Sequence, residues 1–164
     1  MLYFTYGANT HRAQMAHRCP GASFLSQAVL RDHELVFRGV ADIRTATDKT
    51  VTGALWDIDE RDLAALDRFE GYPSLYTRRG VSVLLDRKRH GFDRALAIVY
   101  QMSAGRQLSP PAEAYLETLL QGYLDCDLPD EQLETALMQA HAEHDGTFYR
   151  SRLWGQYGDQ GHAH

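Results

Sequence analysis

The first half of the chain alternates short apolar or aromatic runs with turn residues, a pattern typical of β-strands. The first run, Leu2–Tyr6, stops at Gly7 and is expected to be a buried strand that leads into a turn. Further runs of β-branched, aromatic or aliphatic residues lie at 28–30, 33–38, 51–56, 80–85 and 95–100. This pattern does not define the order in which the strands pair.

Apolar residues recur at helical spacing between two of these runs. Leu63, Leu66 and Phe69 mark one face of a helix that Asp59 is expected to cap and that Gly71 is expected to end. An aspartate at the first position and a glycine just past the last one are typical of helix boundaries, so both ends of this helix are defined by the sequence.

Other helices are expected on either side of the strand-rich region. A short helix over 11–18 follows the first strand. Ser109 with the two prolines after it predicts the start of another helix, whose apolar stripe runs from Tyr115 to Tyr123. Pro129 predicts a last helix. Because most strands precede most helices, the order favours an α+β fold over alternating βαβ units.

Length and composition narrow the class of protein. The chain has 164 residues, with 17 basic and 22 acidic side chains and a net charge of −5. Residues 1–154 are expected to form a single domain, and 155–164, rich in Gly, Gln and His, to be a flexible tail. The acidic balance argues against nucleic-acid binding.

Neither a membrane-spanning helix nor a disulfide framework is expected. No apolar run approaches the roughly 18 residues of a membrane helix, and the N-terminus has no basic-then-apolar signal pattern. Cys19 and Cys126 are too few for a disulfide framework, which favours a reducing cytoplasm. The basic run 87–90 is interpreted as a hairpin turn between strands.

The first candidate site is the turn Gly7-Ala8-Asn9, between the first strand and the short helix. A glycine turn before a helix directs backbone N–H groups outward, which suits a carboxylate or a developing oxyanion. On the pattern alone, an ordinary strand–turn–helix junction is the more common alternative.

The second candidate is Glu70, in the last turn of the helix that begins near Asp59. Carbonyl groups at a helix C-terminus disfavour negative charge, and the aromatic neighbours Phe69, Tyr72 and Tyr76 would desolvate the carboxyl. Both effects raise its pKa toward the range useful for acid/base catalysis near neutral pH. The alternative is a frayed, hydrated helix end beside Arg68.

Taken in order, these and other motifs resemble γ-glutamylcyclotransferases from about residue 1 to about 140. The matching stretches are Tyr3-Phe4-x-Tyr6-Gly7-x-Asn9, Arg18-Cys19-Pro20-Gly21-Ala22, Val51-Thr52-Gly53-Ala54-Leu55-Trp56, Leu66-Asp67-x-x-Glu70-Gly71, Tyr76, Pro111-x-x-x-Tyr115, Leu120-x-Gly122-Tyr123 and Leu128-Pro129. The ordered set is far more specific than any of its pieces.

The resemblance implies a small mixed β-barrel flanked by helices and an enzyme that releases 5-oxoproline from a γ-glutamyl compound without metal or organic cofactor. Glu70 matches the family's acid/base residue. The residues implied to bind the substrate are Tyr6, Gly7, Ala8, Asn9, Tyr76, Tyr100 and Tyr115. One departure is Ala8, where the family loop usually has serine.

Two other function classes remain open: a non-catalytic small-molecule or protein-binding module on the same fold, and a metal-dependent hydrolase using His141 and His144. Two histidines without a further ligand cluster are weak evidence for a metal site, and a solvated helix end is the simpler interpretation. A small-molecule γ-glutamyl substrate is the expected partner. The amine half of that substrate and the oligomeric state are not defined by the sequence.

Overall fold

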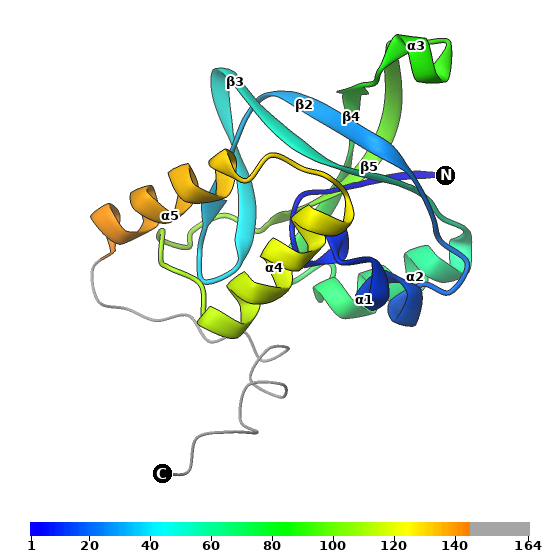
Figure 1. Ribbon diagram of the computed structural model, residues 1–164. Coiled ribbons are helices and arrows are strands. Elements are labelled where there is room, and N and C mark those ends of the chain that lie inside the picture. The colour runs from blue at the N-terminus through cyan, green and yellow to red at the C-terminus, as the bar shows by residue number, and fades with distance from the viewer. Residues whose placement is uncertain (145–164) are drawn as a thin grey trace.

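The computed structural model of the protein describes residues 1–144. Within this range, five strands close into a barrel in the order β1-β3-β2-β4-β5, and helices cover one side and one end of it (Figure 1). The strands are β1 Leu2–Thr5, β2 Ser23–Phe37, β3 Ala41–Asp57, β4 Tyr76–Leu84 and β5 Arg94–Met102. The helical segments are the 3₁₀ turn η1 Ala8–Thr10 and the helices α1 Arg12–Arg18, α2 Glu60–Glu70, α3 Arg87–His90, α4 Glu113–Asp125 and α5 Glu131–Glu143.

The barrel is mixed because one of its seams is parallel. Strand β1 pairs antiparallel with β3 and parallel with β5, where Tyr3 lies opposite Ile98. The pairs β2–β3, β2–β4 and β4–β5 are antiparallel. This arrangement confirms the expected α+β fold with a small mixed barrel flanked by helices.

Two strands expected from the sequence prove to be one. The runs 28–30 and 33–38 both belong to β2, and the polar residues between them form a bulge at Arg31/His33 rather than a turn. Asp32 lies there with a φ of 56°, a backbone conformation in which aspartate is tolerated more readily than most residues. Strand β3 also begins earlier than expected, at Ala41.

Helix α2 has the boundaries that its sequence predicts. The Asp59 carboxylate accepts hydrogen bonds from the backbone N–H groups of Arg61 and Asp62, and the Asp62 side chain accepts one from the Asp59 N–H, completing a capping box. Gly71 ends the helix with a φ of 64°. These caps fix Glu70 as the last helical residue.

The start of α4 was predicted too early. Ser109 does not cap it, because its backbone is hydrogen bonded to the β2–β3 turn, through its N–H to the Phe37 carbonyl and through its carbonyl to the Gly39 N–H. Helix α4 begins only after both prolines, with Ala112 as its cap. The run 87–90 lies in the hairpin connection between the antiparallel strands β4 and β5, as expected, and forms the one-turn helix α3 there.

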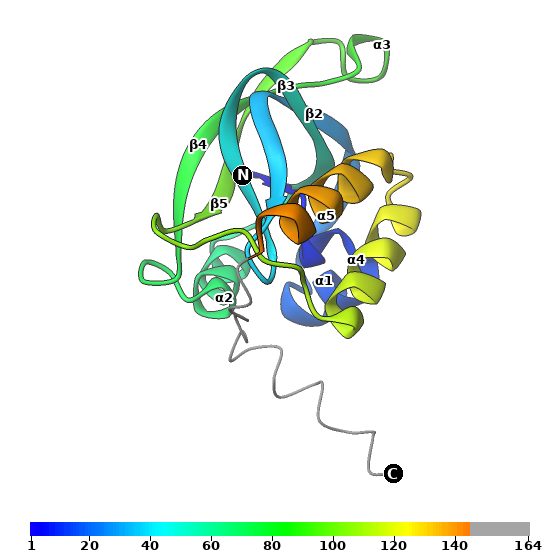
Figure 2. The ribbon, with the colours of Figure 1, turned by 90° about the vertical axis from the view of Figure 1, so that its left-hand side faces the viewer.

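Helix α5 lies against β2 at the side of the barrel, and the other helices lie at its two ends. Helix α3 lies at one end, whereas α1, α2 and α4 lie at the other in both views (Figures 1 and 2). Strand residues and inward residues of α4 and α5 share one hydrophobic core cluster. No helix within 1–144 is long and apolar enough to cross a membrane. The expected tail, 155–164, lies outside the described residues, and the single domain over 1–154 stays a prediction.

Candidate functional site

A cavity opens between β1, the 3₁₀ turn η1 and the C-terminal end of α2. Its empty volume is about 550 Å³ including the solvent at its mouth, within the usual size of small-molecule sites. All the site residues expected from the sequence line it, and they are accompanied by further lining residues that the sequence did not single out. The lining consists of Tyr3, Phe4, Thr5, Tyr6, Gly7, Ala8, Asn9, Val40, Ala41, Phe69, Glu70, Leu75, Tyr76, Tyr100 and Tyr115.

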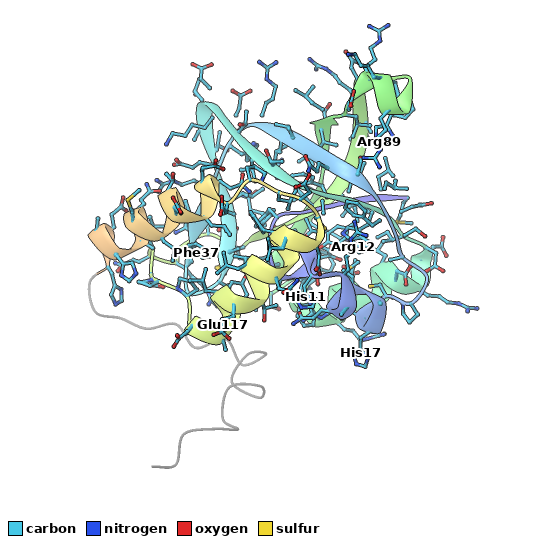
Figure 3. The ribbon with its side chains drawn as sticks, in the orientation of Figure 1. His11, Arg12, His17, Phe37, Arg89 and Glu117 are labelled. Atoms are coloured by element: carbon cyan, nitrogen blue, oxygen red, sulfur yellow. The ribbon has the colours of Figure 1, made fainter. Side chains whose placement is uncertain are left out.

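The turn after β1 is held by its own hydrogen bonds and by α4. The Thr10 N–H and hydroxyl both donate to the Gly7 carbonyl, at 3.0 and 2.8 Å. The Tyr123 hydroxyl of α4 donates to the Tyr6 carbonyl at 3.0 Å. Figure 3 labels His11 and Arg12 where this turn enters α1, beside α4. The turn is therefore positioned by an element more than a hundred residues away.

Glu70 reaches the cavity from the C-terminal end of α2. Its Oε1 accepts a hydrogen bond from Asn9 Nδ2 at 2.9 Å, so the two candidate segments of the sequence meet directly. Desolvation of the half-buried carboxyl raises the pKa of Glu70 to about 7, against the opposing influence of the Arg18 charge and the Asn9 hydrogen bond. A carboxyl with this pKa can both accept and return a proton near neutral pH.

Asn9 connects three side chains. Its Nδ2 also donates to the Tyr3 hydroxyl at 2.9 Å, and its Oδ1 accepts a hydrogen bond from Arg18 Nη1 at 2.5 Å. Arg18 comes from the last turn of α1, and its guanidinium stacks on the Phe69 ring with 3.5 Å from Cζ to the ring centroid. The amide of Asn9 is therefore bonded on both its oxygen and its nitrogen side.

Two of the cavity tyrosines are hydrogen bonded to the β3 start. The Tyr115 hydroxyl, on a side chain only 4% exposed, accepts a hydrogen bond from the Ala41 N–H at 2.9 Å. The Tyr76 hydroxyl donates to the Ala41 carbonyl at 3.2 Å. Burial raises the pKa of Tyr115 far above its ordinary value, so its phenol stays neutral. Both side chains are thus fixed in place by hydrogen bonds.

Two further cavity tyrosines, Tyr6 and Tyr100, are held by hydrogen bonds to β5 and α2. The Tyr6 hydroxyl donates to the Tyr100 carbonyl at 2.7 Å, and the Tyr100 hydroxyl donates to Asp67 Oδ1 at 2.6 Å. Asp67 is also paired with Arg78, whose Nη1 lies 2.8 Å from Oδ2. Burial raises the pKa of both phenols, and hydrogen bonding to the Asp67 carboxylate raises that of Tyr100 further.

Sequence reasoning missed several lining residues. Tyr3 is the clearest of them, and its place in the Tyr3-Phe4-x-Tyr6 motif was a signal that could have identified it. Val40 and Ala41 had no such signal, because they reach the cavity only through the folding of the β2–β3 turn, where Ala41 pairs with Phe37 and is hydrogen bonded to Tyr115. The buried side chain of Ala8 also lines the cavity.

The other candidate groups lie away from this cavity. His141 is in the last turn of α5, His144 follows that helix, and neither lines the cavity. Within 1–144 no three His, Cys, Asp or Glu side chains are grouped as metal ligands would be. Cys19 is buried, its Sγ lies 3.6 Å from the Asp62 carbonyl, and burial raises the pKa of its thiol to about 11, which favours a structural role over a nucleophilic one.

Comparison with known proteins finds γ-glutamylcyclotransferases among both the sequence relatives and the structures with the same fold. Gamma-glutamylcyclotransferases of Bos taurus and Mus musculus are 29% and 27% identical to this chain over 143 and 148 residues, which cover 79% and 81% of it and 73% and 75% of those proteins. A solved gamma-glutamyl cyclotransferase structure shares the fold, with a TM-score of 0.70, 24% identity and 96% of each chain covered. YkqA from Bacillus subtilis shares it as well, with a TM-score of 0.70 and 21% identity over 89% of this chain and 56% of that one.

The family match covers the elements that build the cavity. The family model described as gamma-glutamyl cyclotransferase, AIG2-like, matches residues 3–117, a range that contains every residue of the cavity lining. The chain belongs to the AIG2-like γ-glutamyl cyclotransferase family.

Proposed function

We propose that this protein is a γ-glutamylcyclotransferase that releases 5-oxoproline from a γ-glutamyl amide, with Glu70 as general acid and base. The observation that carries the proposal is the meeting of Glu70 with the Gly7–Asn9 turn in one cavity, where the pKa of the carboxyl is raised to about 7. Membership of the family supports the same activity.

The substrate supplies its own nucleophile. A γ-glutamyl amide carries an α-ammonium group that, once deprotonated, can close a five-membered ring on the γ-carbonyl carbon. The enzyme therefore needs no serine or cysteine nucleophile, and its main tasks are to fold the substrate and to move protons. The small cavity, with its tyrosine side chains held by hydrogen bonds, suits the first task.

Glu70 performs the proton transfers. Ionised Glu70 accepts a proton from the α-ammonium group, and the free amine attacks the γ-carbonyl carbon to form a tetrahedral intermediate. Protonated Glu70 then donates that proton to the leaving nitrogen as the C–N bond breaks. The ring nitrogen loses a second proton, which Glu70 passes to the released amine, giving 5-oxoproline and an ammonium product. The carboxyl ends in its starting state, which is consistent with a pKa of about 7.

Backbone N–H groups of the Gly7–Asn9 turn stabilise the oxyanion of this intermediate. The first amides of a helical turn have no carbonyl partner within that turn, and η1 begins at Ala8. Such donors act most strongly where water is excluded, as beside the buried side chains of Tyr6 and Tyr115. The hydroxyl that Ala8 lacks would contribute about 1 kcal/mol as one further hydrogen bond.

The α-carboxylate of the substrate is bound by neutral donors. Among the described residues, those that line the cavity include no lysine, arginine or histidine. Phenol hydroxyls and backbone amides are the donors available for a carboxylate there. The phenol of Tyr115, from α4, is one such candidate, because it acts as an acceptor in its hydrogen bond with the Ala41 N–H, whereas the Tyr76 hydroxyl donates to the Ala41 carbonyl.

A panel of γ-glutamyl amino acids and γ-glutamyl amines tests the proposal, with 5-oxoproline measured with and without EDTA. Release that persists in EDTA supports it. Release that the chelator abolishes would favour a metal-dependent hydrolase. Tight binding of a panel compound without any turnover would contradict the proposal and favour a binding module.

A further inference from the structure

We propose that Arg18 is a positioning residue that orients the Asn9 amide so that its nitrogen faces Glu70. This inference rests on the proposed function in that it gives Asn9 and Glu70 their roles in the reaction. Arg18 does not line the cavity, so it acts through Asn9 rather than on the substrate.

The contacts of Arg18 tie together the two segments of the site. Its Nη1 donates to Asn9 Oδ1 at 2.5 Å, and its guanidinium lies 3.5 Å above the centre of the Phe69 ring. Phe69 directly precedes Glu70 at the end of α2, whereas Asn9 lies in η1. One side chain of α1 therefore contacts both the turn and the helix end that carries the carboxyl.

The chemistry of the guanidinium determines which way the amide points. A guanidinium has five N–H donors and no acceptor, so it can bond the Asn9 oxygen and not the Asn9 nitrogen. With the oxygen on that side, Nδ2 is directed at Glu70 Oε1 and at the Tyr3 hydroxyl, both at 2.9 Å. Without Arg18 the amide loses the contact that holds its oxygen on that side, so it is free to rotate and its hydrogen bond to Glu70 weakens.

The charge of Arg18 and the hydrogen bond from the oriented Asn9 amide both favour the ionised form of Glu70. The titratable groups that face Glu70 from the other elements are phenols: Tyr3 of β1, Tyr6 after it, Tyr100 of β5 and Tyr115 of α4. The pKa of each phenol is raised, so all are neutral when Glu70 titrates. The Arg18 charge lowers the pKa of Glu70, against the larger effect of desolvation.

The test compares three variants with the wild-type protein. Arg18→Met keeps a long apolar stem against Phe69 and removes the donor and the charge, whereas Arg18→Lys keeps both a donor and the charge. Arg12→Met is the matched control, because Arg12 belongs to the same helix and also stacks on an aromatic ring, that of Phe24, at 4.1 Å. Thermal unfolding confirms that each variant is folded.

The first readout is the titration of Glu70, followed by NMR of ¹³C-labelled glutamate side chains and assigned with the Glu70→Gln variant. We expect the pKa of Glu70 to rise by about one unit in Arg18→Met and to stay near the wild-type value in Arg18→Lys and Arg12→Met. An unchanged titration in Arg18→Met would overturn the inference, whatever its activity.

The second readout is the pH profile of 5-oxoproline release. Since a one-unit rise reduces the ionised fraction about tenfold below the pKa, kcat/KM of Arg18→Met should fall about tenfold at pH 6 and recover as the pH rises. KM should change less than kcat. A loss that is equal at all pH values would also overturn the inference. If the wild-type protein releases no 5-oxoproline while the NMR shift occurs, the proposed function fails and the positioning role stands.

Discussion

Glu70 is subject to opposing influences on its protonation. Desolvation at the end of α2 raises its pKa, while the Arg18 charge and the Asn9 hydrogen bond lower it, leaving a value of about 7. Because the proposed reaction needs ionised Glu70 to accept the substrate proton, kcat/KM should fall as the pH drops below about 7. A pH profile of 5-oxoproline release measures this directly. An acid limb near pH 4.5, the ordinary value for glutamate, would contradict the desolvation argument.

At this scale, the sequence predicted some features of the site better than others. The capping aspartate and Gly71 placed Glu70 at a helix end by local rules alone. The roles of Arg18 and Tyr3 escaped prediction, because their significance depends on a hydrogen bond to Asn9 that only the folded chain makes. Whether the Glu70 side chain lies in water or in a cavity also depends on residues that are far from it in the sequence.

Helix α4 packs closely against the turn before α1 and so positions that part of the site. A Cβ on Gly122 would clash with Thr10 Oγ1 and lie 2.6 Å from the His11 nitrogen. In an exposed helix interior, replacing glycine with alanine is stabilising by up to about 1 kcal/mol. Whether replacing Gly122 with alanine destabilises or stabilises the protein therefore distinguishes close packing from an ordinary helix surface.

We predict that Gly122→Ala lowers the free energy of unfolding by about 1–3 kcal/mol and weakens substrate turnover, because α4 must move away from the turn that carries Asn9. Chemical denaturation and steady-state kinetics measure the two effects. The control is Glu117→Ala, at an exposed position of the same helix labelled in Figure 3, which should leave both nearly unchanged. A stabilised Gly122→Ala variant would contradict the packing argument.

Elements with strong local signals were predicted well, and elements that depend on pairing were not. Helix α2 carries its own capping box, so its boundaries needed no tertiary information. The N-terminal half of β3 is polar and exposed over much of its length, and only its pairing with β2 makes it a strand. At Ser109 the local signal was misleading. The residue favours a helix cap, but its backbone is hydrogen bonded to the β2–β3 turn, so α4 begins later.

For the molecule as a whole, the fold class followed from the order of strands and helices, and the barrel from the family resemblance. The strand order β1-β3-β2-β4-β5 was beyond the sequence pattern, because it depends on pairings between residues far apart, such as Tyr3 with Ile98. The cavity is a product of that closure, since its walls come from elements spread along the chain, namely β1, η1, β3, α2, β4, β5 and α4.

The raised pKa of Glu70 makes the stability of the molecule depend on pH. In the unfolded chain the carboxyl ionises near its ordinary value of 4.5, whereas in the folded protein it ionises near 7. Between these values the unfolded state binds fewer protons, so Glu70 increasingly destabilises the fold as the pH rises, by at most about 3 kcal/mol above pH 7. Below about pH 4.5 the cost is absent.

We therefore predict that Glu70→Gln, which cannot ionise, is more stable than the wild-type protein at pH 8 and equally stable near pH 4.5. Each kcal/mol should raise Tm by about 2–4 °C for a chain of this size. Thermal unfolding across that pH range measures the difference. A difference that does not vary with pH would contradict a titrating, desolvated carboxyl.

The most direct test of the central claim is the rate of 5-oxoproline release by Glu70→Gln on the best substrate of the panel. The control is Glu60→Gln, which changes an exposed glutamate in the first turn of the same helix. The account predicts a folded Glu70→Gln protein whose kcat is reduced by about two to four powers of ten, with Glu60→Gln near the wild-type rate. A Glu70→Gln protein with nearly wild-type kcat would contradict it.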